Sequence, residues 1–224
     1  MKTHKDFLEF LKTVDLISFR QKYAGYKSVE EDLPRNCQIL NHIYKVYWVD
    51  RNFLPYEEFI KEVIKELEGN LRTYNLKRNN HDQDAEAAYP MFLKGWIARQ
   101  YRTWTSIITQ IQLGYLAEQY FPNNEVLMSA ELDAKGIDIR IIGLADIGVK
   151  KVSARRDITI LGEEKEGVVP IKYWVPSSDV LQNPRTKKGK IRKPYLDFKQ
   201  DTRLDYLPNG FIVFTEEVFN DVIQ

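Results

Sequence analysis

The chain has 224 residues, 43% hydrophobic and 29% charged, which is typical of a folded protein and excludes a disordered one. Its 33 Lys and Arg nearly cancel its 32 Asp and Glu, so any nucleic-acid surface requires local segregation of charge. The single cysteine, Cys37, excludes internal disulfides and multi-cysteine zinc sites, and it favours a reducing cytoplasm. The N-terminal stretch has no signal-peptide pattern, and no apolar run reaches about 18 residues, so neither secretion nor a membrane span is expected.

The first half of the chain has the apolar spacing of helices. Amphipathic helices are predicted from Phe7 to Leu16 and from Tyr56 to Leu67. The segment from Asn75 to Asp84 lacks an apolar period and is expected to be an exposed connector. The longest predicted helix runs from Phe92 to Phe121, and apolar side chains surround much of it, which indicates a buried helix.

Beyond Pro122 the pattern changes to short β-branched runs interrupted by glycine, which are typical of strands. A further helix is expected from Leu196 to Tyr206, and a closing helix is expected to begin at Thr215. The sequence therefore predicts an α/β fold in which a helical part, residues 1–121, packs on a mixed sheet, residues 122–224, as one continuous fold. The predicted strands are Glu125–Glu131, Ile137–Ile142, Ile147–Val152, Ile158–Leu161, Val168–Val175 and Phe211–Phe214.

Several kinds of site have little support. The chain has no glycine-rich phosphate loop followed by Lys and Ser or Thr. Cys37 has no motif partner, so a buried structural thiol is expected. The three histidines, His4, His42 and His81, fall in separate segments, which disfavours a metal cluster or a catalytic triad. The aromatic residues of the longest helix have helical spacing and are expected in the core, rather than stacked on bases: Trp96, Tyr101 and Trp104.

The stretch 128–157 concentrates the chemically useful residues. Alternate side chains of a strand share a face, so Gly148 and Lys150 are expected to point together while Val149 points into the core. A carboxylate at the end of one strand and a lysine on the next can hold Mg²⁺ and a water against a phosphate. The acidic candidates lie around the turn at Gly136: Glu131, Asp133 and Asp138.

This layout resembles the core of PD-(D/E)XK nucleases, in which an Asp and an acidic-X-Lys unit on neighbouring strands make the metal site. The Asp corresponds to Asp138, and the second unit to Gly148-Val149-Lys150. Gly148 stands where an acidic residue or Gln is usual. The second carboxylate is therefore expected from Asp133 or Glu131.

Four segments together resemble the TaqI family of type II restriction endonucleases, over about Leu8 to Arg156. The resemblance implies two metal-site aspartates, Asp133 and Asp138, and a lysine on the following strand, for which strand alternation favours Lys150 over Lys151. The segments are the Val29-Glu-Glu-Asp-Leu-Pro34 turn, the Tyr101-Arg-Thr-Trp-Thr-Ser106 helix, the SAELDAKGIDIR block from Ser129 to Arg140, and the Lys150-Lys-x-Ser-x-Arg-Arg156 unit.

The resemblance implies Mg²⁺-dependent hydrolysis of both strands of a short DNA palindrome, with TCGA as the first candidate, leaving 5′-phosphate and 3′-hydroxyl ends. A twofold site is matched most simply by a homodimer, and a cognate DNA methyltransferase is expected in the same prokaryotic system. The Val149 carbonyl and Glu118 are further candidate metal ligands. Two alternatives stay open: a sequence-specific DNA-binding protein without cleavage, motivated by Gly148, and a structure-specific repair or junction-resolving nuclease.

A second cluster of charge runs from Arg185 to Lys199, RTKKGKIRKPYLDFK, in a chain whose net charge is +1. A solvated loop is the plain interpretation, but the local excess of charge favours a DNA-contacting loop. Its lysines are expected on phosphates and Arg185 or Arg192 on a base edge, because guanidinium presents a planar fork. The candidate DNA-binding residues are Ser153, Arg155, Arg156, Arg185, Lys187, Lys188, Lys190, Arg192 and Lys193.

Overall fold

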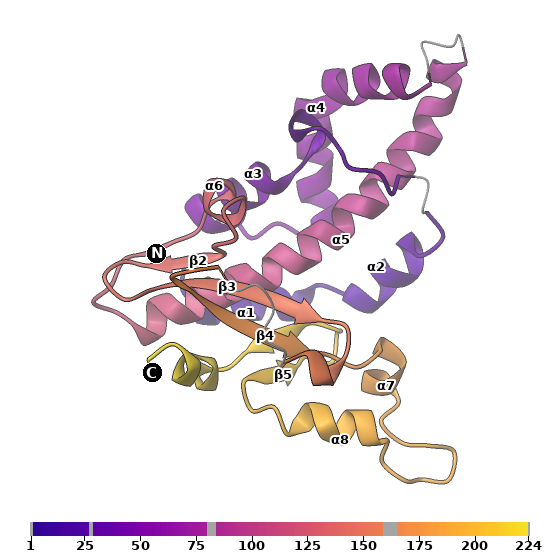
Figure 1. Ribbon diagram of the computed structural model, residues 1–224. Coiled ribbons are helices and arrows are strands. Elements are labelled where there is room, and N and C mark those ends of the chain that lie inside the picture. Colours follow the sequence, from indigo (N-terminus) through magenta and orange to yellow (C-terminus); the bar gives the residue numbers. More distant parts are fainter. Residues whose placement is uncertain (1, 27–28, 80–83, 159–164, 224) are drawn as a thin grey trace. The chain divides into compact units, whose positions relative to one another are not determined.

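Figure 1 shows the computed structural model of the protein, in which helices and strands are mixed as the sequence predicted. His81 and most of the predicted strand Ile158–Leu161 lie outside the described residues. None of the described helices is both long enough and apolar enough to cross a membrane. The structure describes residues 2–26, 29–79, 84–158 and 165–223.

The chain divides into two compact units. One comprises Val14–Ile108, and the other joins Met1–Thr13 to Thr109–Gln224. The long helix α5, Ala85–Tyr120, begins in the first unit and ends in the second. The division that we expected after residue 121 stays a prediction.

The unit Val14–Ile108 is built from helices in its described part. The predicted helix from Tyr56 is confirmed, but it continues to Arg78, so the expected connector Asn75–Asp84 is wrong at its start. Residues 80–83 of that connector lie outside the described residues. The side chain of Asn75 is buried and donates a hydrogen bond to the Ala85 carbonyl at 2.6 Å, which stabilises this end of the helix. The elements are α2 Leu16–Tyr23, η1 Arg35–Cys37, α3 Leu40–Ile43, the π-helical η2 Tyr44–Val49, α4 Tyr56–Arg78 and the first part of α5.

Aromatic side chains of α5 form the core of this unit. Trp96 and Trp104 are fully buried, and Tyr101 is 3% exposed, so their assignment to the core is confirmed. The Trp96 indole donates to the carbonyl of Cys37 at 2.9 Å, and Cys37 itself is buried. The Tyr101 hydroxyl donates to the carbonyl of Leu16 at 3.1 Å, so the polar atoms of Trp96 and Tyr101 have partners inside the unit.

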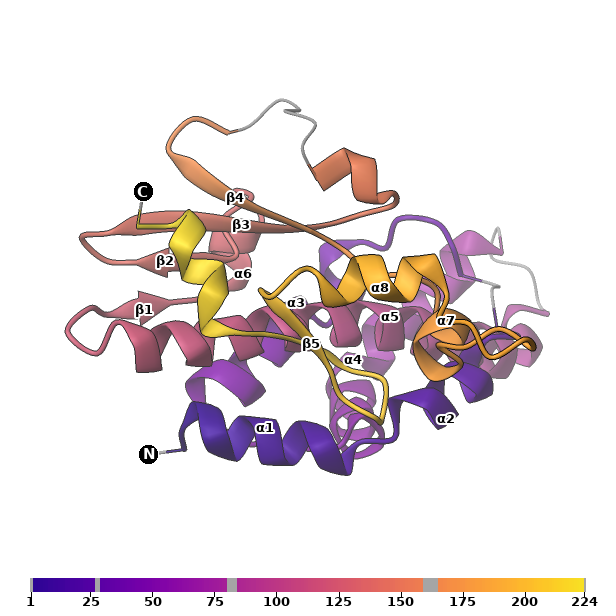
Figure 2. The same ribbon diagram turned by 90° about the horizontal axis from the view of Figure 1, so that it is seen from below.

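The second unit contains a four-stranded mixed sheet of order β1-β2-β3-β4 (Figures 1 and 2). Strands β1, β2 and β3 pair antiparallel, whereas β3 and β4 pair parallel. Ile147 lies opposite Ile139 and beside Val169, and Lys150 lies beside Lys172. The strands are β1 Val126–Leu127, β2 Ile139–Ile141, β3 Ala145–Val152 and β4 Val168–Trp174.

One face of this sheet is buried. Ile147 and Ile171 are fully buried, and Tyr173 contacts the ring of Phe214 with centroids 5.3 Å apart. The other elements of the unit are α1 His4–Thr13, the end of α5, α6 Ala130–Asp133, η3 Arg155–Ile158, α7 Ser178–Gln182, α8 Lys193–Lys199, the antiparallel pair β5 Leu204–Tyr206 and β6 Ile212–Phe214, and η4 Glu216–Asp221.

Four elements of this unit differ from the prediction in their bounds or their type. The strand expected from Glu125 ends at Leu127, because the Ser129 hydroxyl accepts the amide of Leu132 and so begins helix α6. The helix expected from Leu196 to Tyr206 ends at Lys199, and its last part is strand β5. Ile158 lies in the 3₁₀ turn η3 and not in a strand, and the closing helix is also 3₁₀.

Candidate active site

Asp138 directly precedes β2, and the backbone of β3 holds its side chain. Its amide donates to the carbonyl of Ile147 at 2.9 Å, and its carboxylate accepts the amide of Val149 at 2.6 Å. The residue is only 8% exposed. Because the N–H and C=O of one strand residue point to the same side, the Val149 carbonyl faces the edge on which Asp138 lies.

Asp133 reaches the same place from the end of helix α6. The Gly136 amide donates to the Asp133 carbonyl at 2.8 Å, and the Ile137 amide donates to the Leu132 carbonyl at 3.0 Å. Gly136 has a φ of +70°, a conformation that favours glycine. This tight turn folds the chain back, so that the carboxyl groups of Asp133 and Asp138 hydrogen-bond with each other.

The two carboxyl groups have altered acidity. Burial, together with the hydrogen bond and charge of Asp133, raises the pKa of Asp138 to about 6, and the bond from the Val149 amide opposes this shift. Burial also raises the pKa of Asp133. Two like charges at this separation disfavour double ionisation, so the pair holds a proton more tightly than an exposed carboxylate.

The donor set of this pair suits a hard divalent cation. Such a cation supplies the opposite charge that lets both carboxylates ionise. In the described part of the chain, no group of three or more His, Cys, Asp and Glu gathers into a possible metal site. Two carboxylates fit Mg²⁺ nevertheless, since Mg²⁺ usually keeps several waters and takes one or two protein carboxylates.

The two weaker acidic candidates have other surroundings. Glu131 is exposed in the first turn of α6, where its own amide and the Ser129 side chain lower the pKa of its carboxyl. Glu118 is half-buried near the end of α5. The structure therefore pairs Asp138 with Asp133 and not with Glu131.

The lysines of β3 follow the predicted alternation. Val149 lies on the face of the buried Ile147, although it is only half-buried and not in the core as expected. Gly148 and Lys150 lie on the opposite face, and Lys150 is exposed. Lys150 thus follows the residue whose amide Asp138 binds, whereas Lys151 shares the face of Val149.

Gly148 leaves room for the turn that carries Asp133. A Cβ atom at this position would lie 3.2 Å from the Gly136 carbonyl oxygen and 3.2 Å from a methyl of Val168. Both distances are tighter than most real Cβ contacts, and one of the two neighbours is backbone. The turn therefore occupies the space in which the usual acidic side chain of the motif would begin.

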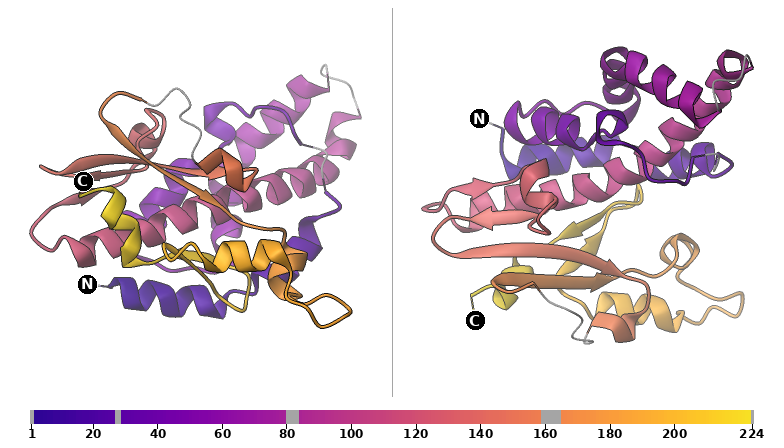
Figure 3. Two further views of the ribbon diagram at one scale, coloured as in Figure 1. Left: turned by 60° about the horizontal axis from the view of Figure 1, so that its bottom comes forward. Right: turned by 45° about the horizontal axis from the view of Figure 1, so that its top comes forward.

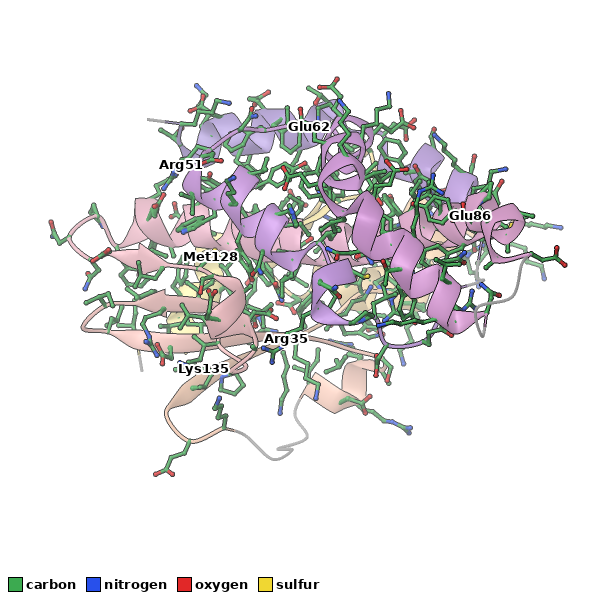
Figure 4. All side chains as sticks on the ribbon, turned by 90° about the horizontal axis from the view of Figure 1, so that it is seen from above. Arg35, Arg51, Glu62, Glu86, Met128 and Lys135 are labelled. Atoms are coloured by element: carbon green, nitrogen blue, oxygen red, sulfur yellow. The ribbon has the colours of Figure 1, made fainter. Side chains whose placement is uncertain are left out.

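Sequence reasoning missed Lys165, which precedes β4. Its amine donates a hydrogen bond to the carbonyl of Lys135, the residue labelled in Figure 4 within the turn between α6 and β2. The hydrogen bond from Arg140 lowers the pKa of Asp146, and the charge of Lys165 adds a smaller shift in the same direction. No local signal identified it, because the contact joins segments 30 residues apart in the sequence.

The basic residues 185–192 form a hydrogen-bonded hairpin between α7 and α8, visible as a projecting loop in Figure 3, and Lys193 begins α8. The Thr186 amide donates to the Lys190 carbonyl and the Gly189 amide to the Thr186 carbonyl, both at 2.8 Å. Arg185 donates to the Gly189 carbonyl at 3.0 Å, and Arg192 pairs with Asp179. The exposed lysines of the hairpin and its base are Lys187, Lys188, Lys190 and Lys193.

The other candidate DNA-binding residues lie directly after β3. Ser153 donates to the carboxylate of Asp157 at 3.3 Å. Arg155 and Arg156 open η3, and the Arg156 side chain is 87% exposed. Arg156 pairs with Asp157 at 3.7 Å, and Arg155 pairs with Asp197 at 2.7 Å.

These features define a mixed α/β protein with a paired-aspartate centre beside a basic strand. The chain belongs to the TaqI restriction endonuclease family, whose pattern it matches over residues 4–224. It is 31% identical to the type II restriction enzyme TthHB8I of Thermus thermophilus, over 99% of this chain and 87% of that protein. It is 29% identical to the type II restriction enzyme TaqI of Thermus aquaticus, with the same coverage. No solved structure matches the chain significantly.

Proposed function

We propose that the protein is a type II restriction endonuclease that hydrolyses both strands of DNA at a short palindrome with Mg²⁺. The observation that carries this proposal is the contact between Asp133 and Asp138, held against Val149 one residue before Lys150. Membership of the TaqI restriction endonuclease family supports the same chemistry. The proposal includes a PD-(D/E)XK core. In this core Asp133 supplies the carboxylate that the motif usually has at the position of Gly148.

Asp133, Asp138 and the carbonyl of Val149 are the proposed metal ligands. Bound Mg²⁺ would polarise the scissile phosphate and make a nucleophile from water. The Val149 amide fixes the Asp138 carboxylate, so the ligand geometry is set before DNA arrives. Glu131 and Glu118 remain second choices for the reasons given above.

Lys150 is the proposed catalytic lysine. Its place on the face of Gly148 lets its amine approach a phosphate that lies beside the aspartates. There it would orient the attacking water, assist its deprotonation and offset the growing negative charge. In-line attack with the 3′ oxygen leaving gives 5′-phosphate and 3′-hydroxyl ends.

The hairpin lysines and Lys193 are the proposed phosphate contacts, with Ser153, Arg155, Arg156, Arg185 and Arg192 as further DNA contacts. The internal hydrogen bonds of the hairpin favour this role, because a preformed turn presents its charges at lower entropic cost than an unstructured loop. Such contacts supply affinity for any sequence.

The recognition sequence and assembly belong to the same proposal. TCGA is the first site to test, and a twofold dimer is the simplest match to a palindrome. Protection of host DNA would require a cognate methyltransferase in the cytoplasm of the same prokaryotic cell.

Digestion of plasmid DNA with Mg²⁺ separates this function from its two alternatives. We expect discrete fragments whose sequenced ends share one palindrome, and whose ends accept labelled phosphate only after phosphatase treatment. Specific binding without cutting would favour the cleavage-inactive DNA-binding protein, for which Gly148 is the motivation. Nicking confined to branched or mismatched DNA would favour the structure-specific nuclease.

A further inference from the structure

A pocket of about 310 Å³ lies where β4, η3 and α8 meet. Its apolar part comes from Trp174, Phe198 and Ile158, and its polar part from the C-terminal end of α8, the residues that directly follow it and the start of η3. This combination of flat aromatic surface and a few polar groups is typical of ligand sites. The polar lining residues are Arg155, Asp197, Gln200 and Asp201.

Arg155 is fixed in this pocket by two acceptors. Its guanidinium pairs with the carboxylate of Asp197 at 2.7 Å and donates to the side-chain oxygen of Gln200 at 3.1 Å. These contacts use only part of the five N–H donors of an arginine. The fork is therefore oriented in advance, and donors remain for a ligand.

The charges of the pocket are balanced. The second carboxylate, that of Asp201, accepts two hydrogen bonds from Arg203 at 2.9 Å, while Asp197 is paired with Arg155. A phosphate site requires an excess of positive charge, which this arrangement lacks. The pocket suits a neutral, flat group with hydrogen-bond acceptors, and a nucleobase is such a group.

The register of the sheet places the pocket near the proposed catalytic lysine. Lys150 lies beside Lys172 in the sheet, and Val152 lies beside Trp174. Trp174 is thus on the same face as Lys150 and about 6.5 Å further along the strands. DNA whose phosphate lies at Lys150 would present a base within a few steps of that phosphate, since bases are about 3.4 Å apart.

We infer that this pocket is a base-reading subsite for guanine, in which Arg155 is the specificity-determining residue and Asp197 and Gln200 are positioning residues. The inference rests on the proposed action on DNA. Guanine is the base with two acceptors, O6 and N7, that match an arginine fork. Arg192 and Arg185 do not line this pocket: Arg192 pairs with Asp179, and Arg185 bonds to its own turn.

The test is a double-mutant cycle. It combines a substitution of Arg155 in the protein with removal of the N7 acceptor from guanine in the DNA. The preferred site is first selected from random duplexes by binding to Asp138→Asn protein, so that cleavage is not needed. Each guanine of that site is then replaced by 7-deazaguanine. When Asp138→Asn is the only substitution in the protein, we expect 7-deazaguanine at one position to weaken binding about fivefold. That replacement removes one of the two hydrogen bonds between arginine and guanine.

The Arg155→Lys variant should bind the selected duplex about 5- to 150-fold more weakly and be insensitive to 7-deazaguanine at that position. Binding to unrelated duplexes should change little. Asp197→Asn should weaken the coupling between Arg155 and guanine N7. The melting temperature of this variant shows whether it is still folded. The control is Arg140→Lys, which alters a comparable ion pair with Asp146 outside the pocket and should keep the full sensitivity.

The inference is overturned if Arg155→Lys responds to every 7-deazaguanine as the parent protein does, or if no sequence is selected. Failure of the proposed function is a separate result. A selected site that plasmid digestion leaves uncut would contradict cleavage but preserve the subsite. A cut plasmid without Arg155 coupling would contradict the subsite alone.

Discussion

The carboxylate of Asp138 accepts the backbone amide of Val149 at 2.6 Å, one residue before Lys150. The backbone of β3 therefore sets the position of this carboxylate relative to the lysine. A side-chain donor could turn away, but a strand amide cannot move without breaking the pairing of β3 with its neighbours. Changes in the β3 backbone should therefore disturb the site as much as changes in its side chains.

Gly148→Ala should damage both stability and activity. The added Cβ would lie 3.2 Å from the Gly136 carbonyl and would displace the turn that carries Asp133. We expect the free energy of unfolding to fall by about 1–3 kcal/mol, as in other overpacked sites. Chemical denaturation measures this change. Gly69→Ala is the control, since nothing lies within 4 Å of its Cβ and alanine favours helix α4; equal effects of the two changes would contradict a steric role for Gly148.

Asp138→Asn should change how stability depends on pH without divalent cations. The folded-state pKa of about 6 lies above the value of about 3.9 for an exposed aspartate, so the folded protein binds this proton more tightly. The resulting stabilisation is complete below about pH 4 and is lost as the pH rises through about 6.

In the wild type, the free energy of unfolding should decline by at most about 3 kcal/mol over this pH range. The variant should lack much of this decline. Thermal unfolding in EDTA from pH 4 to pH 8 compares the two proteins. Addition of Mg²⁺ at pH 7.5 should stabilise the wild type more than the variant. If stability depended on pH in the same way in the two proteins, Asp138 would not be the group whose pKa is raised.

The two lysines of β3 should differ in importance. Lys150 lies on the face of Gly148, whereas Lys151 lies on the face of Val149, so Lys150→Ala should lower the single-turnover cleavage rate far more than Lys151→Ala. Loss of a group that acts on the transition state lowers the rate without an equal loss of DNA binding. The reverse ranking would place the catalytic amine on the other face of β3.

Replacement of Lys187 and Lys188 by alanine should weaken binding to all DNA sequences alike. The logarithm of the binding constant plotted against the logarithm of salt concentration should lose about 0.9 in slope for each lost phosphate contact. The control replaces Lys61 and Lys65, two exposed lysines of α4, and removes the same charge elsewhere. An unchanged slope for the hairpin variant would remove these lysines from the DNA interface.

The sequence predicted the elements whose apolar residues recur with a regular period. It also predicted the site residues that lie within the single stretch 128–157. The buried helix with Trp96 and Trp104 was predictable because its apolar spacing is continuous. The approach of Asp133 to Asp138 was anticipated only through the family resemblance, since it depends on the Gly136 turn. The contact of Lys165 with Lys135 and the pairing of Arg155 with Asp197 were not predictable, because each joins segments that are distant in the sequence. Likewise, the cap at Ser129 overrode the β-branched run that precedes it.

The central claim is that the paired aspartates support cleavage through Mg²⁺. The most direct test is single-turnover digestion of one supercoiled plasmid by the wild type and by Asp138→Asn, each with Mg²⁺ and with EDTA. We predict discrete fragments only for the wild type with Mg²⁺, and a rate at least about a thousandfold lower for the variant, which should still bind the selected site. Cleavage by Asp138→Asn at a rate near that of the wild type, or cleavage that persists in EDTA, would contradict the account.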